Sequence, residues 1–196
     1  MKFLAFVLIT IPLLTNAQDK GIHFINRLDW DQSLAKARST NKLLFIDCYA
    51  IWCRPCRFMN DSIFSNQEVA DFLNKNFINI KVKMDSAIDG YQDGEDKQAN
   101  VDMIKKKYQI SAYPTFLFVE PSGELVYRIV GTYESPESFI KKASKALDQD
   151  EQYFFLLEQY NSGRRNPVFI SRLIVAAENS GDKVMANKLK KEYTPE

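Results

Sequence analysis

Residues 47–59, DCYAIWCRPCRFM, decide the fold and the chemistry of this 196-residue chain. Two of its three cysteines, Cys53 and Cys56, are separated only by Arg54 and Pro55. Such a pair can be a redox couple, part of a metal site, or a structural disulfide that holds a loop closed. The residue types around the pair distinguish these three interpretations.

Metal binding and a structural disulfide both fit the pair poorly. Cys48, Cys53 and Cys56 reproduce part of an iron–sulfur spacing, but the sequence has no fourth cysteine. A zinc site would also take four ligands, and the single histidine, His23, argues against a histidine-based site. A disulfide that closes so short a loop stabilises a fold by only about 2 kcal/mol. We therefore predict no metal.

The redox interpretation accounts for every residue of the motif. A cysteine at a helix N-terminus has a lowered pKa, because unpaired N–H groups and the helix dipole stabilise its thiolate. Arg54 and Arg57 add positive charge, and Pro55 suits a first helical turn. Cys53 is therefore predicted to be the exposed nucleophile. Cys56, one turn further in, is predicted to be shielded and to resolve the mixed disulfide.

Hydrophobic patterns on both sides of the motif predict an α/β domain with a mixed central sheet. Residues 43–49 form an apolar run with one acid, as a strand buried on both faces does. Residues 77–84 alternate between apolar and polar, and strands at 115–119 and 125–130 flank a Pro-Ser-Gly turn. The remaining predicted elements are an edge strand at 22–24, a polar loop at 85–100, and helices at 30–38 (capped by Asp29), 55–63, after Ser65, 101–108 and 137–147.

Residues 149–196 show a helical pattern without strands. Phe154, Leu157 and Tyr160 are expected to face one way, as are later apolar residues at helical spacing. We predict an all-helical C-terminal extension that packs on the preceding domain or on a partner.

Residues 1–17 have the pattern of a signal peptide. Lys2 precedes an apolar run at 3–14, and Ala17 ends a group of small residues, as before a cleavage site. The run is shorter than the about 20 residues that span a bilayer, although an uncleaved membrane anchor is the alternative. We expect an exported protein, periplasmic in location, with no membrane span after cleavage.

The charge balance argues against nucleic acid as a partner. Without Lys2, the 26 Lys and Arg residues fall to 25, which equals the number of Asp and Glu residues. A neutral chain has no electrostatic footprint for nucleic acid or anionic lipid. The basic run at 105–107 is interpreted as the solvated face of a helix.

The motif WCRPC at 52–56 after a buried strand, followed by Tyr113-Pro114-Thr115, resembles the thioredoxin superfamily. The chain is most similar to exported bacterial thioredoxin-like thiol:disulfide oxidoreductases. The resemblance covers about residues 29–147 and implies a thioredoxin-like domain at 18–148. It rests on both motifs, in this order and at this distance, because a CxxC motif alone is far less specific.

The resemblance implies a role for each site residue. Cys53 matches the nucleophile and Cys56 the resolving cysteine, with no cofactor beyond their redox-active disulfide. Pro114 matches the cis-proline that faces the pair and leaves backbone groups free for a substrate strand, the alternative being an ordinary trans proline. Asp47 matches a buried acid whose raised pKa lets it exchange a proton with Cys56, the alternative being an acid hydrogen-bonded at the strand end. Substrate contacts are expected from Trp52, Arg54, Pro55 and Tyr113.

Two residues depart from the thioredoxin pattern. Arg54 stands where thioredoxins have glycine, which leaves the redox potential open. Cys48 is not a catalytic position of the family, and we interpret it as a buried free thiol. The expected function is an exported reductase of protein disulfides, recharged by a membrane-linked electron donor. A thioredoxin-like binding module and a disulfide isomerase are the alternatives, and the oligomeric state is not predicted.

Overall fold

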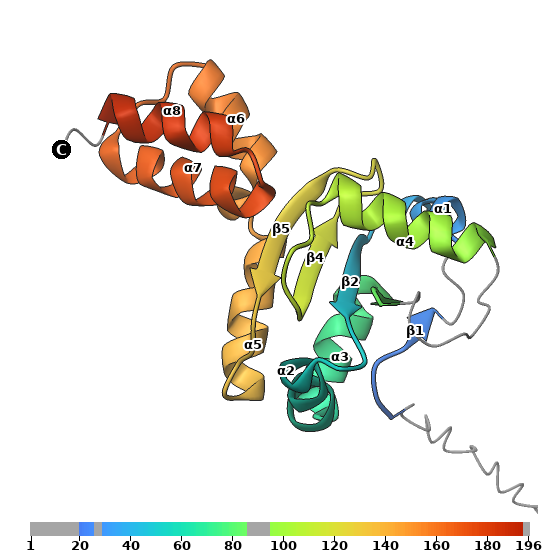
Figure 1. Ribbon diagram of the computed structural model, residues 1–196. Helices are drawn as coiled ribbons and strands as arrows, with labels where there is room; N and C mark the ends of the chain where they lie inside the picture. Colours follow the sequence, from blue (N-terminus) through green and yellow to red (C-terminus); the bar gives the residue numbers. More distant parts are fainter. Residues whose placement is uncertain (1–19, 26–28, 86–94, 194–196) are drawn as a thin grey trace, which may run out of the picture.

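The computed structural model describes residues 20–25, 29–85 and 95–193. Its described strands form one mixed sheet in the order β1-β3-β2-β4-β5 (Figure 1). The parallel strands are β1 (Phe24–Ile25), β3 (Phe77–Lys83) and β2 (Leu43–Tyr49), and the antiparallel strands are β4 (Thr115–Val119) and β5 (Leu125–Val130). The predicted mixed sheet of an α/β domain is therefore confirmed.

Helices cover both faces of the sheet. One face packs against α1 (Trp30–Thr40) and α4 (Glu95–Lys107). The other face packs against α2 (Arg54–Phe58), the π-helical turn η1 (Met59–Ile63), α3 (Gln67–Asn76) and α5 (Pro136–Ala143), which continues as a 3₁₀ turn, η2 (Ser144–Leu147).

The alternation of side chains along β2 assigns its residues to these two faces. Ile46 and Cys48 belong to the apolar cluster under α1 and α4, whereas Phe45 belongs to the cluster under η1, α3 and α5. Because side chains two residues apart share a face of a strand, Asp47 points to the same side as Phe45. The acid therefore lies on the face that α2 and η1 cover.

Aromatic packing fills the core on this face. Five phenylalanine rings have centroids within 6.4 Å of the Phe45 ring. They come from β3, β4, α5 and the residue that follows η1: Phe64, Phe77, Phe116, Phe118 and Phe139. The contacts with Phe64 and Phe139 are edge-to-face and that with Phe116 is stacked, and aromatic pairs of these kinds add stabilisation beyond the buried area. The result is a rigid support beneath the strand that carries Asp47.

Several predicted boundaries are corrected by the structure. The edge strand lies at Phe24–Ile25, and α4 begins at Glu95, within the predicted polar loop. The remainder of that loop, 86–94, lies outside the described residues. Asn66 caps α3 by accepting from the N–H groups of Glu68 and Val69, whereas the Ser65 hydroxyl donates to the Asp61 carbonyl.

The C-terminal helices form a separate bundle. It consists of η3 (Gln149–Glu151), α6 (Tyr153–Asn161), α7 (Pro167–Ser180) and α8 (Lys183–Tyr193), and it has its own apolar cluster. The bundle contacts β5 mainly through α7 and lies at the opposite end of the domain from α2 (Figure 1).

One prediction about the bundle is wrong. Tyr153, Leu156 and Tyr160 form the buried face of α6, whereas Phe154 is exposed. The buried face also includes an intersegment bond, because the Tyr153 hydroxyl donates to Asp182 Oδ2 at 2.6 Å.

No helix within residues 20–25, 29–85 and 95–193 is long and apolar enough to cross a membrane. The predicted signal peptide, 1–17, lies outside the described residues.

Candidate active site: the Cys53–Cys56 disulfide

Cys53 and Cys56 are joined by a disulfide where β2 passes into α2. Their Cα atoms are 5.3 Å apart. Cys53 is the N-cap residue of α2, Arg54 and Pro55 form its first turn, and Cys56 follows on the buried side of the helix. The N–H group of Cys56 donates to Cys53 Sγ at 3.1 Å. A donor in this position favours negative charge on the Cys53 sulfur once the disulfide opens.

Cys56 is shielded as predicted, whereas the predicted exposure of Cys53 is wrong. Cys53 is 2% exposed and Cys56 is 7% exposed, so neither residue is open to solvent in the disulfide form. Together with Ala50 they form a small apolar cluster, against which Tyr49 and Tyr113 pack. The aromatic cover explains why the first cysteine is not exposed.

Hydrogen bonds to the two residues after β3 and to α2 hold the loop that leads into the motif. The Met84 N–H donates to the Tyr49 carbonyl at 2.8 Å, and the Ile51 N–H donates to Asp85 Oδ2 at 2.8 Å. Arg57 also donates from Nη1 to the Ile51 carbonyl at 3.0 Å. Three bonds thus fix the backbone directly before the cysteine pair.

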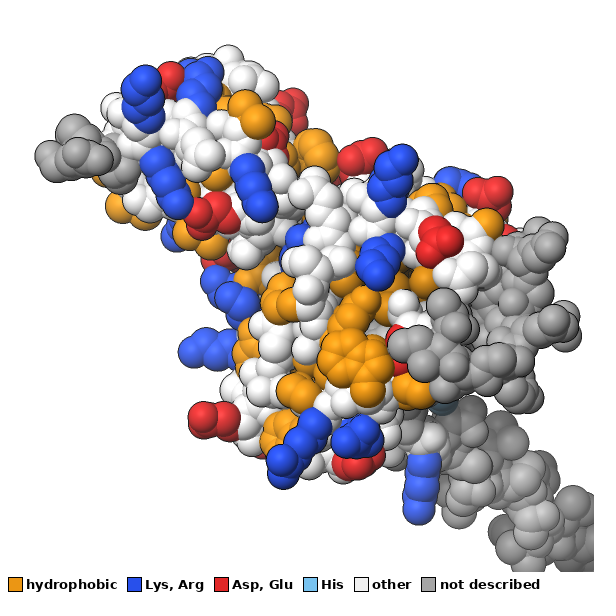
Figure 2. Space-filling model, in the orientation of Figure 1, with side chains coloured by type: hydrophobic (Ala, Val, Ile, Leu, Met, Phe, Trp, Pro, Cys, Tyr) orange, Lys and Arg blue, Asp and Glu red, His pale blue; other side chains and the backbone are white. Residues whose placement is uncertain are grey.

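Trp52 and Tyr113 form an aromatic pair beside the disulfide. Their ring centroids are 5.9 Å apart with an interplanar angle of 73°, and Trp52 is 63% exposed. Figure 2 shows hydrophobic side chains gathered on the face in view, where Figure 1 shows β2 ending and α2 beginning. An exposed apolar surface of this kind is a candidate contact area for another protein.

Pro114 follows Tyr113 and is buried. The Tyr113–Pro114 peptide bond is cis. The Pro114 carbonyl accepts a hydrogen bond from the Gly131 N–H at 3.0 Å. The residue after β5 thus already pairs with this carbonyl, and the expectation that backbone groups near Pro114 bind a substrate strand stays a prediction.

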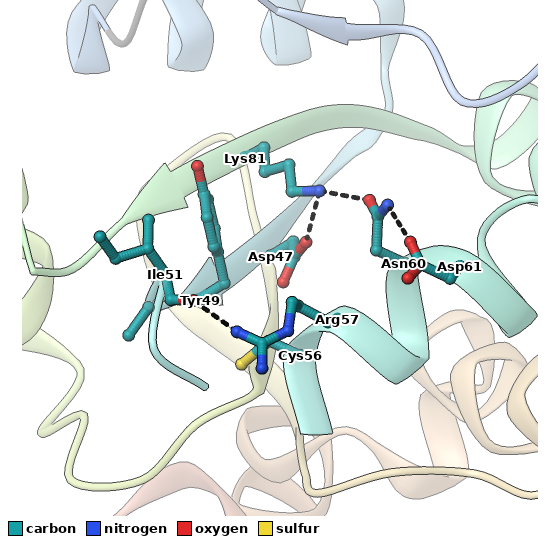
Figure 3. A pocket seen from close by; sticks show the side chains of 9 residues that line it. Asp47, Tyr49, Ile51, Cys56, Arg57, Asn60, Asp61 and Lys81 are labelled. Atoms are coloured by element: carbon teal, nitrogen blue, oxygen red, sulfur yellow. Dashed lines mark hydrogen bonds and ion pairs between the residues drawn. The ribbon is translucent and has the colours of Figure 1, made fainter. Parts of the chain in front are cut away.

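Asp47 is not a lone carboxylate beneath the pair. Residues 47 and 81 are in register on the parallel strands β2 and β3, and Asp47 Oδ2 lies 3.8 Å from Lys81 Nζ. The same ammonium donates to Asn60 Oδ1 at 2.7 Å, and Asn60 in turn donates to Asp61 (Figure 3). The η1 turn therefore contributes two polar groups to the surroundings of the buried acid.

Burial raises the pKa of Asp47 from 3.8 to about 6, although the positive charge and hydrogen bond of Lys81 lower it. Desolvation prevails because Asp47 is only 3% exposed. An acid with a pKa near neutrality can both accept and donate a proton under physiological conditions.

A cavity of about 450 Å³ lies over Asp47 and one of the two cysteines. Asp47 and Cys56 lie at its base, and the surrounding side chains are Tyr49, Ala50, Ile51, Arg57, Asn60, Asp61 and Lys81. Arg57, Asn60 and Asp61 are exposed, so they form its rim. Cys53 does not line this cavity.

Cys48 is a buried free thiol, as predicted. Burial, together with the neighbouring Asp47 carboxylate, raises its pKa further above the usual range of a thiol. A thiol that stays protonated and buried is a poor nucleophile.

The family model described as a thioredoxin-like domain matches residues 30–147. The chain belongs to the thioredoxin-like family. With its CxxC pair at disulfide distance, this thioredoxin-like protein is a thiol:disulfide oxidoreductase. The matched residues end at the 3₁₀ turn η2, and the α6–α8 bundle lies beyond them.

Relatives at sequence level include a plant thioredoxin. Thioredoxin H4 of Arabidopsis thaliana is 37% identical over 102 residues, which are 52% of this chain and 71% of that protein.

Solved structures support the same fold. A proposed disulphide-isomerase from Bacteroides thetaiotaomicron is 38% identical, with a TM-score of 0.52 over 67% of this chain and 98% of that chain. The DsbH oxidoreductase has a TM-score of 0.57 over 70% of this chain and 94% of that chain, and at 16% identity it shows the fold alone.

Three polar residues of this thioredoxin-like site were missed by the sequence analysis: Asn60, Lys81 and Asp85. Lys81 stands at a polar position of an alternating strand, and only the register with β2 brings it to Asp47. Asn60 reaches Lys81 from a π-helical turn, and no local sequence pattern indicates that turn. Asp85 is the second residue after the end of β3, and an acid at the end of a strand is a signal that could have been used.

Proposed function

We propose that this protein is an exported thiol:disulfide oxidoreductase that reduces disulfides in other proteins. One observation carries the proposal: the bonded Cys53–Cys56 pair stands at a helix start, and Cys56 lines the same cavity as a buried acid whose pKa is raised to about 6. This arrangement provides a nucleophile, a resolving thiol and a proton carrier.

The reaction proceeds in two exchanges. The Cys53 thiolate attacks one sulfur of a substrate disulfide, the substrate S–S bond breaks, and a substrate thiolate leaves. Cys56, after losing its proton to Asp47, then attacks Cys53 in the mixed disulfide. The second substrate thiolate leaves and takes up a proton, and the Cys53–Cys56 disulfide is formed. Two electrons pass from the pair to the substrate.

The residues beside the Cys53–Cys56 pair form the surface that is proposed to bind a protein substrate. Trp52 and Tyr113 offer exposed aromatic area, and Arg54 adds a positive charge at the same edge. Pro55 shapes the first turn of α2, and Pro114 lies in the segment adjoining Tyr113. A protein strand lying across these residues would bring its disulfide to Cys53.

Export is supported by the signal-peptide pattern of residues 1–17. A reductase in an oxidising compartment such as the periplasm needs a supply of electrons, and we propose a membrane-linked donor. N-terminal sequencing of the exported form tests whether residues 1–17 are a signal peptide. Cleavage after Ala17 is the expected result.

A disulfide isomerase is the second candidate, favoured by the 38% identity to the proposed disulphide-isomerase. An isomerase would restore activity to a scrambled disulfide protein without net change in its number of thiols. A reductase would release free thiols from it.

The reduction potential of the Cys53–Cys56 pair tests the direction of the reaction. It is measured by equilibrating the protein without residues 1–17 in glutathione buffers and trapping the thiols. A value near the about −270 mV of thioredoxin is expected. A value near the about −120 mV of DsbA would show that the protein oxidises its substrates.

A further inference from the structure

The ammonium of Lys81 is held by groups from three elements. Its Nζ atom lies 2.7 Å from Asn60 Oδ1 in η1, and 5.1 Å and 5.5 Å from the ring centroids of Tyr49 in β2 and Phe24 in β1. Both rings are within the about 6 Å over which an aromatic face attracts a cation. Asp47 Oδ2 is a further neighbour, at 3.8 Å. The position of the ammonium is therefore set by more than the acid.

Asn60 makes the shortest of these contacts. Its amide oxygen lies at a hydrogen-bonding distance from the ammonium, whereas the 3.8 Å to Asp47 is about 1 Å longer than a charge-assisted hydrogen bond usually is. Two opposite charges attract more strongly at the shorter distance. Asn60 thus competes with Asp47 for the Lys81 ammonium.

The Asn60 side chain is itself oriented by Asp61. Its Nδ2 donates to Asp61 Oδ1 at 3.0 Å, so its oxygen is turned toward Lys81 (Figure 3). An ammonium only donates and a carboxylate only accepts, so this orientation of the amide is the one that satisfies both neighbours. Both residues belong to η1, whose π-helical turn closes with a bond from the Phe64 N–H to the Met59 carbonyl. The turn therefore presents an acceptor to the lysine of β3.

Other titratable or charged side chains also surround the buried acid. Tyr49, Cys56, Arg57 and Asp61 line the same cavity, and Cys48 and Lys83 are the further such residues of β2 and β3 near it. Tyrosine is uncharged at neutral pH, the disulfide-bonded Cys56 does not titrate, and burial keeps the Cys48 thiol protonated. Arg57 and Asp61 are exposed, so solvent screens their charges. Lys83 stands opposite Tyr49, beyond the acid in the register of β2 and β3.

We propose that Asn60 is a positioning residue for the resolving step, because it holds the Lys81 ammonium short of Asp47. The acid thereby stays able to accept the Cys56 proton. The inference rests on the proposed redox function of the pair. The exchange itself is unchanged: the proton moves from Cys56 to Asp47, the Cys56 thiolate attacks Cys53, and the substrate thiolate leaves. Without the Asn60 oxygen, the ammonium would close on the carboxylate, and the more strongly stabilised carboxylate would be a weaker base.

The titration of Asp47 in the oxidised protein tests the positioning. Its carboxyl carbon is followed by NMR from pH 4 to pH 8 in protein that is isotope-labelled at aspartate. In Asn60→Ala we expect the midpoint to fall by about half to one pH unit, as for a cation that moves about 1 Å closer to the acid. In a Lys81→Met background, Asn60→Ala should leave the midpoint unchanged. A midpoint that does not fall in Asn60→Ala alone would overturn the proposal.

Ser62→Ala is the matched control, because Ser62 is an exposed polar residue of the same turn that does not line the cavity. It should leave the midpoint as it is. Equal shifts in Ser62→Ala and Asn60→Ala would show that any change in η1 disturbs the acid, and would overturn a specific role for Asn60. Asn60→Asp keeps an acceptor for the ammonium, so it should not show the fall. A fall as large as that in Asn60→Ala would also count against the proposal.

Release of substrate from the mixed disulfide links the acid to the reaction. Single-turnover release is followed from pH 5 to pH 9, and its midpoint in Asn60→Ala is expected to fall together with that of Asp47. A shifted NMR midpoint with an unshifted release midpoint would overturn the role of Asn60 in the resolving step. Failure of the natural protein to reduce a protein disulfide would instead count against the proposed function, while the NMR titration would still decide whether Asn60 positions Lys81.

Discussion

Asp47 Oδ2 and Lys81 Nζ lie 3.8 Å apart, in register on two neighbouring parallel strands. The backbone register of these two strands makes the two residues neighbours. The ammonium is also held by Asn60 at 2.7 Å, so it is not free to close fully on the acid. Burial raises the pKa of Asp47, and Lys81, whose ammonium also bonds Asn60, lowers it only in part.

Replacing Asp47 by Asn should stabilise the oxidised protein at pH 7. A pKa raised from 3.8 to about 6 means that the folded protein binds a proton more tightly than the unfolded chain, so its stability falls as the pH rises between these values. The loss amounts to about 3 kcal/mol at neutral pH. Urea unfolding at pH 4 and pH 7 should show this decrease in the natural protein and not in Asp47→Asn. An equal decrease in the natural protein and in Asp47→Asn would contradict the assignment of this pH dependence to Asp47.

Replacing Lys81 by Met should move the pH dependence of the resolving step upward. Lys81 lowers the pKa of Asp47, so its removal raises that pKa further, by about one pH unit. Single-turnover release of substrate from the mixed disulfide, followed from pH 5 to pH 9, measures the midpoint. The control is Asp47→Asn with Lys81→Met, in which the shift should disappear. If Lys81→Met alone leaves the pH midpoint of substrate release unchanged, a group other than Asp47 controls the resolving step.

Replacing Trp52 by Ala should weaken the reaction with protein substrates. Trp52 is 63% exposed and its ring lies against Tyr113, so it offers contact area to a large partner. We expect kcat/KM for a protein disulfide to fall roughly tenfold, as for a buried aromatic contact in an interface. The rate with 2-mercaptoethanol should change much less. Similar losses with both reagents would indicate a disturbed active site, and Trp52→Phe should retain most of the activity.

Replacing Asp182 by Ala should destabilise the C-terminal bundle by about 2 kcal/mol. One carboxylate oxygen caps α8 by accepting from the Met185 N–H, and the other accepts from the Tyr153 hydroxyl. Tyr153→Phe removes only the second bond and should cost about 1 kcal/mol. The double variant should lose less than the sum, because both changes remove that bond. Thermal unfolding measures these effects, and the reduction potential should stay constant.

The strands were predictable because their signals are local. The apolar run of β2 and the two strands of the β4–β5 hairpin have the predicted bounds, and β3 ends one residue earlier than predicted. The start of α4 was missed because residues 95–100 are mostly polar and show no apolar periodicity. A π-helical turn such as η1 depends on tertiary packing, and the continuous helix predicted at 55–63 is divided by it.

The parts of the site that lie close together in the sequence could be predicted. The cysteine pair and its place at a helix start follow from residues 52–56, and the acid follows from the preceding strand. Lys81 could not be assigned, because its meeting with Asp47 requires the β2–β3 register. Exposure of Cys53 was predicted wrongly, since the aromatic cover of Tyr113 comes from a residue sixty positions away.

The C-terminal bundle and the disulfide occupy opposite ends of the molecule, with β5 as the main bridge to the bundle (Figure 1). Two ligands, one at each end, would therefore not collide. Any influence of one on the other has to pass through the framework, for example along β5, where Arg128 donates to the Tyr108 carbonyl at the end of α4. A partner attached to the bundle would therefore leave the cysteine pair at the far end accessible.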